Sequence, residues 1–354
     1  MSAAPQRAMI LAAGRGIRLA PLTHERPKPL LPLAHLTILH FPLLLARHAG
    51  VRDVMMNLHH LGHQIRDQFG DGADLGISIR YSEEQPHLLG TGGGIKRARS
   101  FLEGGSFVIL NGDTLTDVDL PAVIDFHARS GAIATMVLAD PRPENNFGIV
   151  RVDDTLQVRD ISGRLCWDGQ GGRAGHFCGI HVMEPRVFDY MPKEDVFCVN
   201  ADVYPRMIAA GERVVGCFLA RGFRDVGTPA RYLETAEAIL DGTLHPTYLG
   251  NAALRAHSEV AGLPRNVWVA RSARVDPSAA IQGPVYAGPG VVVGPRARLG
   301  PYALLAEGSR VGEGAQVRHA ILWERASLPP GRLLERAILT SRLELPLDTA
   351  RGAL

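Results

Sequence analysis

An apolar residue recurs at every sixth position in the last quarter of the chain, and no other feature of the sequence constrains the fold as strongly. The ten positions are Val269, Val275, Ile281, Ala287, Val293, Leu299, Leu305, Val311, Val317 and Trp323. A six-residue period with small residues between the apolar ones is typical of a parallel β-helix, in which each hexad forms one face of a triangular coil and the periodic residue points inward. The pattern therefore predicts a left-handed parallel β-helix over residues 266–354. Several edge strands of a small sandwich are the alternative.

The first two-thirds of the chain has a different pattern, in which strand-like and helix-like segments alternate. Residues 8–13 and 107–110 are apolar runs typical of buried strands, whereas residues 229–240 have helical spacing. Apolar strands that alternate with helices predict a mostly parallel sheet covered on both faces, as in a Rossmann-like α/β domain. We expect this domain to span residues 1–242, and a linker to span residues 243–265, where the periodicity fades.

The composition is that of an ordinary globular chain, and it excludes several classes of function. Among 354 residues, 38 are basic and 36 are acidic, and no basic stripe stands out, so we expect no nucleic-acid partner. No stretch approaches the roughly 20 apolar residues of a membrane span. The four cysteines have no C-x-x-C spacing, which indicates reduced core residues. We therefore expect no membrane association and a cytoplasmic location.

A glycine-rich segment follows the first apolar run and carries the clearest chemical signal. Glycines at the end of a strand let backbone N–H groups cradle phosphate oxygens, and Arg18 and Lys28 would add cationic groups for a polyphosphate. Leu19 stands where the dinucleotide fingerprint G-x-G-x-x-G needs glycine, and the G-K-[ST] of a Walker loop is absent. A plain glycine-rich turn beside two solvated basic residues is the alternative. The residues expected to bind the nucleotide here are Leu11, Ala12, Ala13, Gly14, Arg15 and Gly16.

Five segments, taken in their order along the chain, resemble the signature motifs of the nucleotide-sugar pyrophosphorylases. They are Gly14-x-Gly16-x-Arg18 with Pro21-Leu22-Thr23 and Pro27-Lys28-Pro29; Leu89 to Gly94; Asn111-Gly112-Asp113; Asn146-Phe147-Gly148; and Asp225-Val226-Gly227-Thr228-Pro229. The resemblance covers about residues 8–240, and a C-terminal β-helix is itself common in this family. It implies an enzyme that transfers a nucleotidyl group from a nucleoside triphosphate to a sugar 1-phosphate and releases pyrophosphate, with Mg²⁺ as cofactor.

The resemblance also implies roles for individual residues. Arg18 would hold the β- and γ-phosphates, and Lys28 would neutralise the reacting phosphates. Asp113 and Asp225 would bind Mg²⁺, although plain turn carboxylates are the alternative; Asp113 also follows an apolar strand, at the edge of a parallel sheet where ligands bind. The residues expected to lie against the base are Gly90, Thr91 and Gly92, and those expected to contact the sugar are Asn111, Gly148 and Gly179.

The base and the sugar are less constrained than the reaction. Guanine presents two adjacent donors that a carboxylate of Glu83 or Glu84 would accept, whereas uracil offers one, so we expect GTP, as in the mannose-1-phosphate guanylyltransferases. Plain solvated loop carboxylates are the alternative for both residues. An N-acetylmuramate-1-phosphate or other hexose-1-phosphate uridylyltransferase is one alternative, and a catalytically silent sensor of nucleotide sugars is another. The sugar pocket departs from the commonest family type. Many members have a Glu-Lys-Pro segment, whose lysine contacts the sugar phosphate, where this chain has Arg159 to Arg164, so Arg159 and Arg164 are the two candidates to replace that lysine. Many members also have asparagine where this chain has Cys178 before Gly179.

The β-helix offers little chemistry of its own. Ten hexads make only about three coils of roughly 18 residues, which is short for an acyltransferase, although His319 is a lone histidine within them. A short coil stack has exposed ends that need covering. We therefore expect the β-helix to brace the first domain and to hold a homo-oligomer together.

Overall fold

The computed structural model describes residues 5–141, 148–165, 167, 169, 171–249 and 266–347. The chain divides into two compact units. Unit 1 comprises Met1–Leu30 and Leu39–Phe223, and unit 2 comprises Leu31–Ile38 and Arg224–Leu354. Residues 224–242, which the sequence pattern groups with the first domain, thus belong to the same unit as the C-terminal strands.

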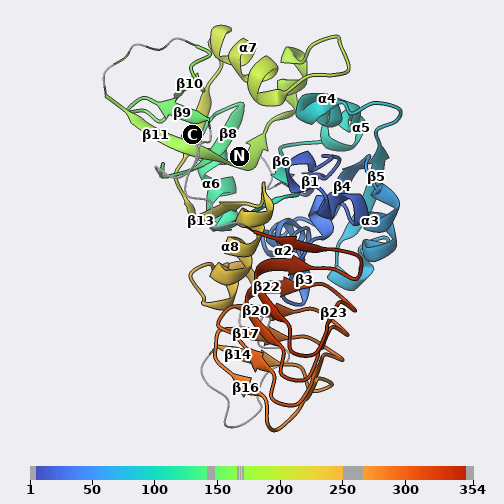
Figure 1. Cartoon of the computed structure of the whole chain (residues 1–354). Coiled ribbons are helices and arrows are strands. Elements are labelled where there is room, and N and C mark those ends of the chain that lie inside the picture. The colour runs from blue at the N-terminus through green and yellow to red at the C-terminus, as the bar shows by residue number, and fades with distance from the viewer. Residues whose placement is uncertain are drawn as a thin grey trace. The chain divides into compact units, whose positions relative to one another are not determined.

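Unit 1 is built around a nine-stranded sheet with the order β10-β9-β11-β6-β1-β4-β5, in which β8 also pairs with β11, and β12 with β8 (Figure 1). The strands are β1 (Arg7–Leu11), β4 (Asp53–Leu58), β5 (Ser78–Glu83), β6 (Phe107–Asn111), β8 (Ala134–Ala139), β9 (Ile149–Val152), β10 (Val158–Ile161), β11 (Arg173–Met183) and β12 (Val214–Cys217). Strands β6, β1, β4 and β5 are parallel, whereas β11 is antiparallel to β6, β8 and β9. The predicted Rossmann-like α/β architecture is confirmed, with its parallel part at β6 to β5.

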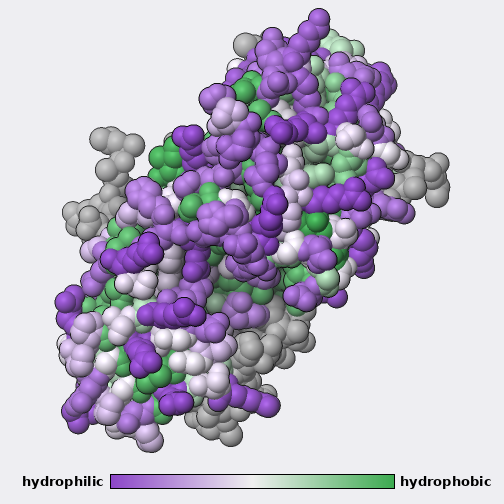
Figure 2. Space-filling model, turned by 90° about the vertical axis from the view of Figure 1, so that its right-hand side faces the viewer, coloured by the Kyte–Doolittle hydropathy of each residue, from purple (hydrophilic) through white to green (hydrophobic). Residues whose placement is uncertain are grey.

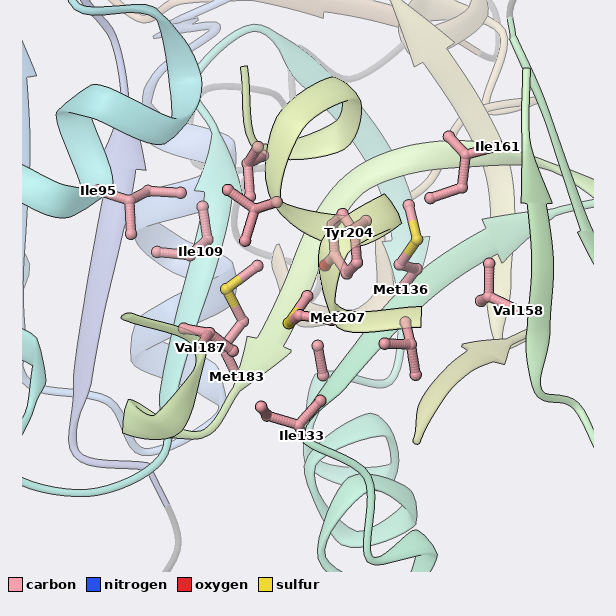
Figure 3. Packing of buried hydrophobic residues seen from close by; sticks show 14 of the residues in the cluster. Ile95, Ile109, Ile133, Met136, Val158, Ile161, Met183, Val187, Tyr204 and Met207 are labelled. Carbon is pink, nitrogen blue, oxygen red and sulfur yellow. The ribbon is translucent and has the colours of Figure 1, made fainter. Parts of the chain in front are cut away.

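Helical segments come directly after four of these strands, namely β1, β4, β5 and β11. The helical segments of this unit are η1 (Ile17–Leu19), α1 (Leu22–Glu25), η2 (Lys28–Leu30), α2 (His40–His48), α3 (Gly62–Phe69), η3 (Ala73–Leu75), α4 (Gly90–Arg97), α5 (Arg99–Leu102), α6 (Leu120–Ser130), η4 (Pro185–Tyr190), the π-helical turn η5 (Val199–Val203) and α7 (Tyr204–Ala209). Figure 3 shows how α7 contributes to the core: Tyr204 and Met207 lie among side chains of the sheet, including Met136 of β8 and Met183 of β11. A separate two-stranded sheet pairs β7 (Thr114–Val118) with β13 (Ala220–Asp225).

Unit 2 contains a hairpin, a helix and a stack of short parallel strands (Figure 1). The hairpin is β2 (Pro32–Leu33) with β3 (Leu36–Thr37), and the helical segments are α8 (Pro229–Leu240) and η6 (Thr247–Leu249). The stacked strands are β14 (Val267–Val269), β15 (Arg274–Val275), β16 (Ala280–Ile281), β17 (Val285–Ala287), β18 (Val292–Val293), β19 (Arg298–Leu299), β20 (Ala303–Leu305), β21 (Arg310–Val311), β22 (Gln316–Leu322), β23 (Ser327–Leu328) and β24 (Leu333–Leu339), and β25 (Glu344–Pro346) pairs antiparallel with β24. The predicted parallel β-helix is therefore confirmed.

The length of a coil changes along the β-helix, and this corrects one predicted inward position. Val267 pairs with Val285, 18 residues later, but Leu305 pairs with Leu322, only 17 residues later. Leu322 therefore takes the interior position that the strict six-residue period assigns to Trp323. The interior continues through Leu328, Leu334 and Leu339, so the stack extends beyond the three coils expected from the period.

The outward side chains of one β-helix face are also buried. Tyr286, Leu304, Ile321 and Ile338 occupy equivalent positions in successive coils and are almost fully inaccessible to solvent. Helix α8 packs against β22 and β24, and its Glu237 Oε1 lies 2.9 Å from His319 Nδ1. The Tyr232 hydroxyl of α8 donates to Pro32 O of the hairpin at 2.5 Å. The hairpin and α8 therefore form one packed unit with the β-helix, and His319 serves this packing.

Hydrophilic residues predominate on the face shown in Figure 2, with hydrophobic residues interspersed among them. Within the described ranges, no helix combines the length and the apolar character that a membrane crossing requires.

Candidate active site

The parallel strands of unit 1 end together, and the glycine-rich loop begins at that edge. Leu11, the last residue of β1, pairs with Asn57 of β4 on one side and with Asn111 of β6 on the other. The loop from Ala12 follows at once. Gly14 in this loop is exposed and has no positive φ, and a Cβ placed on it would meet no atom of the described chain within 4 Å. Neither its backbone nor a protein neighbour requires glycine, so its open side is available to a ligand.

Gly16 has the opposite environment, because it packs against the lysine motif. Its φ is 60°, and a Cβ placed on it would lie 3.0 Å from both Lys28 Cβ and the Thr23 methyl carbon. The Thr23 hydroxyl donates to Gly16 O at 3.2 Å. The three parts of the first motif segment, which contain Gly16, Thr23 and Lys28, are therefore in direct contact, and a side chain at position 16 would crowd Thr23 and Lys28.

Lys28 and Asp113, which are 85 residues apart in the sequence, form an ion pair in which Nζ lies 2.5 Å from Oδ2. The Lys28 side chain is 8% exposed and that of Asp113 is 35% exposed. The residues fit a magnesium site in one respect: a carboxylate at the strand edge keeps an accessible face, and hard cations prefer such oxygen ligands. The structure thus brings together the lysine expected to neutralise the reacting phosphates and one of the two carboxylates expected to bind Mg²⁺.

Asp225, the other expected magnesium ligand, is the last residue of β13 and lies in unit 2. Its Oδ2 is 3.6 Å from Nη1 of Arg231 on α8, and Thr228 caps that helix by accepting from the Arg231 N–H. Joint binding of Mg²⁺ by Asp113 and Asp225 stays a prediction, since the two residues belong to different units. Over the part of the chain that the structure describes, no group of three or more His, Cys, Asp or Glu side chains is placed to hold a metal.

The second glycine-rich segment packs against a distant part of the chain that the sequence did not single out. A Cβ on Gly93 would lie 1.9 Å from Asp195 O, and one on Gly92 would lie 2.3 Å from the Phe197 ring. The Thr91 hydroxyl accepts from Val199 N at 3.0 Å. These contacts explain glycine at positions 92 and 93 without a ligand; contact of this segment with the base stays a prediction.

The expected sugar-contacting residues are placed as follows. Gly179 has a φ of 72°, and a Cβ there would lie 2.6 Å from Asn111 Nδ2, so these two residues are neighbours. Gly148 lies against Ser162, while the preceding Asn146 and Phe147 are outside the described residues. Arg159, one candidate for the missing family lysine, donates from Nε to Asp153 at 2.7 Å, which leaves Arg164, an exposed residue, as the other candidate.

The two carboxylates expected to read guanine have different surroundings. Glu83 is exposed and ion-pairs with Arg66. Glu84 is 1% exposed; its Oε1 accepts from Asn57 Nδ2 at 2.7 Å and its Oε2 from Leu89 N at 2.8 Å. Asn57 in turn accepts from Ala12 N at 2.8 Å. Sequence reasoning missed Asn57; the only signal was an amide side chain near the end of an apolar strand.

Comparison with known proteins agrees with this arrangement. Residues 7–242 match the nucleotidyl transferase family. The chain belongs to this family. The match includes the loop from Ala12, Lys28, Asp113 and Asp225, so it spans both compact units.

Curated relatives of this nucleotidyl transferase carry three different substrate names. The UTP–glucose-1-phosphate uridylyltransferase of Synechocystis is 29% identical and covers 94% of this chain and 87% of its own. The mannose-1-phosphate guanylyltransferase of Mycobacterium tuberculosis is 32% identical, over 66% of this chain and 65% of that protein. The N-acetylmuramate alpha-1-phosphate uridylyltransferase of Neisseria meningitidis is 35% identical, over 66% of this chain and 97% of that protein. All three are sugar-1-phosphate nucleotidylyltransferases.

The solved structure of a putative glucose-1-phosphate thymidylyltransferase from Bacillus anthracis, in complex with a sucrose, is similar in fold to about two-thirds of this nucleotidyl transferase. The TM-score is 0.57 at 19% identity, over 66% of this chain and 94% of that chain.

Proposed function

We propose that this nucleotidyl transferase joins a nucleoside triphosphate to a sugar 1-phosphate, forming a nucleotide sugar and pyrophosphate. The observation that carries the proposal is the Lys28–Asp113 pair beside a loop whose Gly14 is open to a ligand. A cation and a metal-binding carboxylate at one strand edge suit a reaction in which two phosphates must meet. A silent sensor would not need both groups.

The chemistry is a displacement at phosphorus. An oxygen of the sugar phosphate attacks the α-phosphorus of the triphosphate, and the bond from that phosphorus to the β-phosphate oxygen breaks, so pyrophosphate leaves. Because the incoming phosphate is already ionised near neutral pH, no general base is needed. Catalysis is then mainly positioning and charge neutralisation, which Lys28 supplies at the reacting groups and Arg18 at the leaving pyrophosphate. Asp113 and Asp225 would hold Mg²⁺, which when bound supplies positive charge to the phosphate oxygens.

The base is the finer question. The sequence favours GTP, with mannose 1-phosphate as the acceptor. One observation favours UTP as a second candidate: both Glu84 oxygens already accept hydrogen bonds from the chain, and the side chain is 1% exposed, so it has no accessible face to offer guanine. The argument for guanine then depends on Glu83, which is exposed but paired with Arg66.

An assay of pyrophosphate release tests both the proposed reaction and the choice of base. Five nucleoside triphosphates are each combined with a panel of hexose 1-phosphates, with and without MgCl₂. Magnesium-dependent release that needs both substrates supports the activity, and the ratio of kcat/KM for GTP and UTP decides the base. Absence of release from every pair, with nucleotide binding intact, would instead support the sensor.

The homo-oligomer and the cytoplasmic location stay proposals from the sequence. The packing of the hairpin and α8 against one β-helix face accounts for cover of that face within the chain itself.

A further inference from the structure

Two buried polar side chains connect the two glycine-rich segments of unit 1. Starting from the first segment, Ala12 N donates to Asn57 Oδ1 at 2.8 Å, and Asn57 Nδ2 donates to Glu84 Oε1 at 2.7 Å. From the second segment, the backbone N–H of Leu89, the N-cap residue before α4, donates to Glu84 Oε2 at 2.8 Å. A continuous chain of hydrogen bonds therefore runs from the end of β1 to the start of α4.

The surroundings of this pair show that the fold makes room for it. Asn57 is 4% exposed and Glu84 is 1% exposed. A Cβ on Gly94 of α4 would lie 2.8 Å from Glu84 Oε1 and 2.9 Å from Asn57 Nδ2, so glycine at position 94 leaves the space that the pair occupies. The Glu84 carbonyl also lies 2.7 Å from His59 Nδ1. Buried polar groups are costly unless they are hydrogen-bonded, and here each has a partner.

The directions of the hydrogen bonds require an amide at position 57 and a carboxylate at position 84. The carboxylate of Glu84 only accepts, and it receives one donor on each oxygen. Asn57 must accept on one side and donate on the other, which an amide does and a carboxylate does not. The Glu84 carboxylate also lies at the N-terminal end of α4, where the helix dipole favours negative charge. The chain thus places its own anion there, so we expect the nucleotide phosphates to bind at the loop from Ala12 instead.

We propose that Asn57 and Glu84 are positioning residues that hold the loop from Ala12 at a set distance from the segment from Leu89. Under the proposed function, on which this inference rests, the first segment binds the phosphates and the second lies against the base. One nucleotide must contact both segments, so their separation determines how tightly it binds. Neither side chain touches substrate in this assignment.

Four variants test the assignment. Glu84→Gln replaces an acceptor by a donor that faces either Asn57 Nδ2 or Leu89 N, and Asn57→Asp sets two carboxylates against each other. The double variant Asn57→Asp with Glu84→Gln restores all three hydrogen bonds with the roles of the two side chains exchanged. Ala12 N donates to one oxygen of the new aspartate, and the amide nitrogen of the new glutamine donates to the other oxygen of that aspartate. Leu89 N donates to the amide oxygen of the glutamine. Glu103→Gln makes the same chemical change at an exposed residue of the same unit, to which no role in binding is assigned, and is the control.

The measurements are KM and kcat for the triphosphate and for the sugar 1-phosphate, binding of GTP and UTP by calorimetry, and hydrogen exchange at the Ala12 and Leu89 amides. Each single variant should raise the triphosphate KM by about tenfold or more. The free energy of a hydrogen bond to a buried charged group corresponds to a change in affinity of at least that factor. The sugar-phosphate KM should change little, both amides should exchange faster, and the double variant should return all values to within about threefold of the wild type. Glu103→Gln should leave the triphosphate KM, the sugar-phosphate KM and both exchange rates unchanged.

Single variants that melt earlier but keep the wild-type triphosphate KM would overturn the assignment, because the pair would then only stabilise the fold. A double variant as impaired as the sum of its parts would overturn it too. If the wild type converts no pair of substrates, the proposed function fails separately. Exchange at Ala12 and Leu89 still decides whether the pair holds the two segments, since it needs no turnover.

Discussion

Replacing Lys28 by methionine tests whether its charge serves the reaction or only the fold. Methionine keeps an unbranched stem, so the contact between position 28 and Gly16 is retained, whereas the charge that lies 2.5 Å from Asp113 Oδ2 is removed. Asp113 is 35% exposed, so water can solvate its carboxylate after the change. Loss of the pair should therefore cost less stability than the roughly 3–5 kcal/mol lost when one partner of a fully buried pair is removed.

The effect on turnover should be much larger. A preorganised group that stabilises developing charge contributes about 10²–10³ to kcat, or about 3–4 kcal/mol. We expect Lys28→Met to lower kcat by this factor while the triphosphate KM changes only a few-fold, as measured by steady-state pyrophosphate release and a melting curve. Lys193→Met, which removes the charge of an exposed lysine in the same unit, is the matched control. A kcat within about threefold of the wild type, or a loss confined to KM, would refute a role for Lys28 at the reacting phosphates.

Four other outcomes are expected. Asp113→Asn should lower turnover by orders of magnitude with little change in the melting curve, and Asp225→Asn should also raise the Mg²⁺ concentration for half-maximal rate; near-normal rates in saturating Mg²⁺ would contradict both assignments. Gly93→Ala should cost about 1–3 kcal/mol in chemical denaturation, because its Cβ would overlap Asp195 O, whereas Gly105→Ala, with open space around it, should be nearly neutral. A chain that ends at Leu249 should have a lower melting temperature than the full chain, because α8 loses its packing against β22 and β24. Light scattering of the full and the shortened chain tests the oligomer, and equal assembly sizes would exclude a role for the β-helix in oligomerisation. If guanine is read by Glu83, Glu83→Gln should lower the kcat/KM ratio of GTP to UTP, and an unchanged ratio would argue against it.

Much of the site could be predicted from the sequence, because local chemistry determines it. Gly14 lies in the loop after β1, where a Cβ would meet no atom of the described chain. Lys28 and Asp113 lie in short motifs whose residue types suit phosphate and metal. Their pairing at one strand edge follows from parallel strands that end together.

The sequence did not indicate which atoms of the chain surround two groups of site residues. Glu84 looked like a solvent-facing carboxylate available to a base, yet it is buried between Asn57 and Leu89. Gly92 was expected to lie against the base, which stays a prediction; the structure adds that the absent side chains of Gly92 and Gly93 make room for Phe197 and Asp195, more than 100 residues away. A residue type indicates which interactions are possible, but burial and the neighbouring atoms decide which one is made.

By itself, the sequence determined the order of motifs, the α/β pattern and the periodic interior of the β-helix, since these depend on residues that are close along the chain. Only the tertiary structure decided that the β-helix coils shorten from 18 to 17 residues after Leu305, and that the hairpin at 31–38 and α8 belong with the β-helix. The reason is physical: a coil closes wherever its backbone hydrogen bonds and its interior packing are both satisfied, and an apolar face is buried against whichever segment the whole chain brings to it.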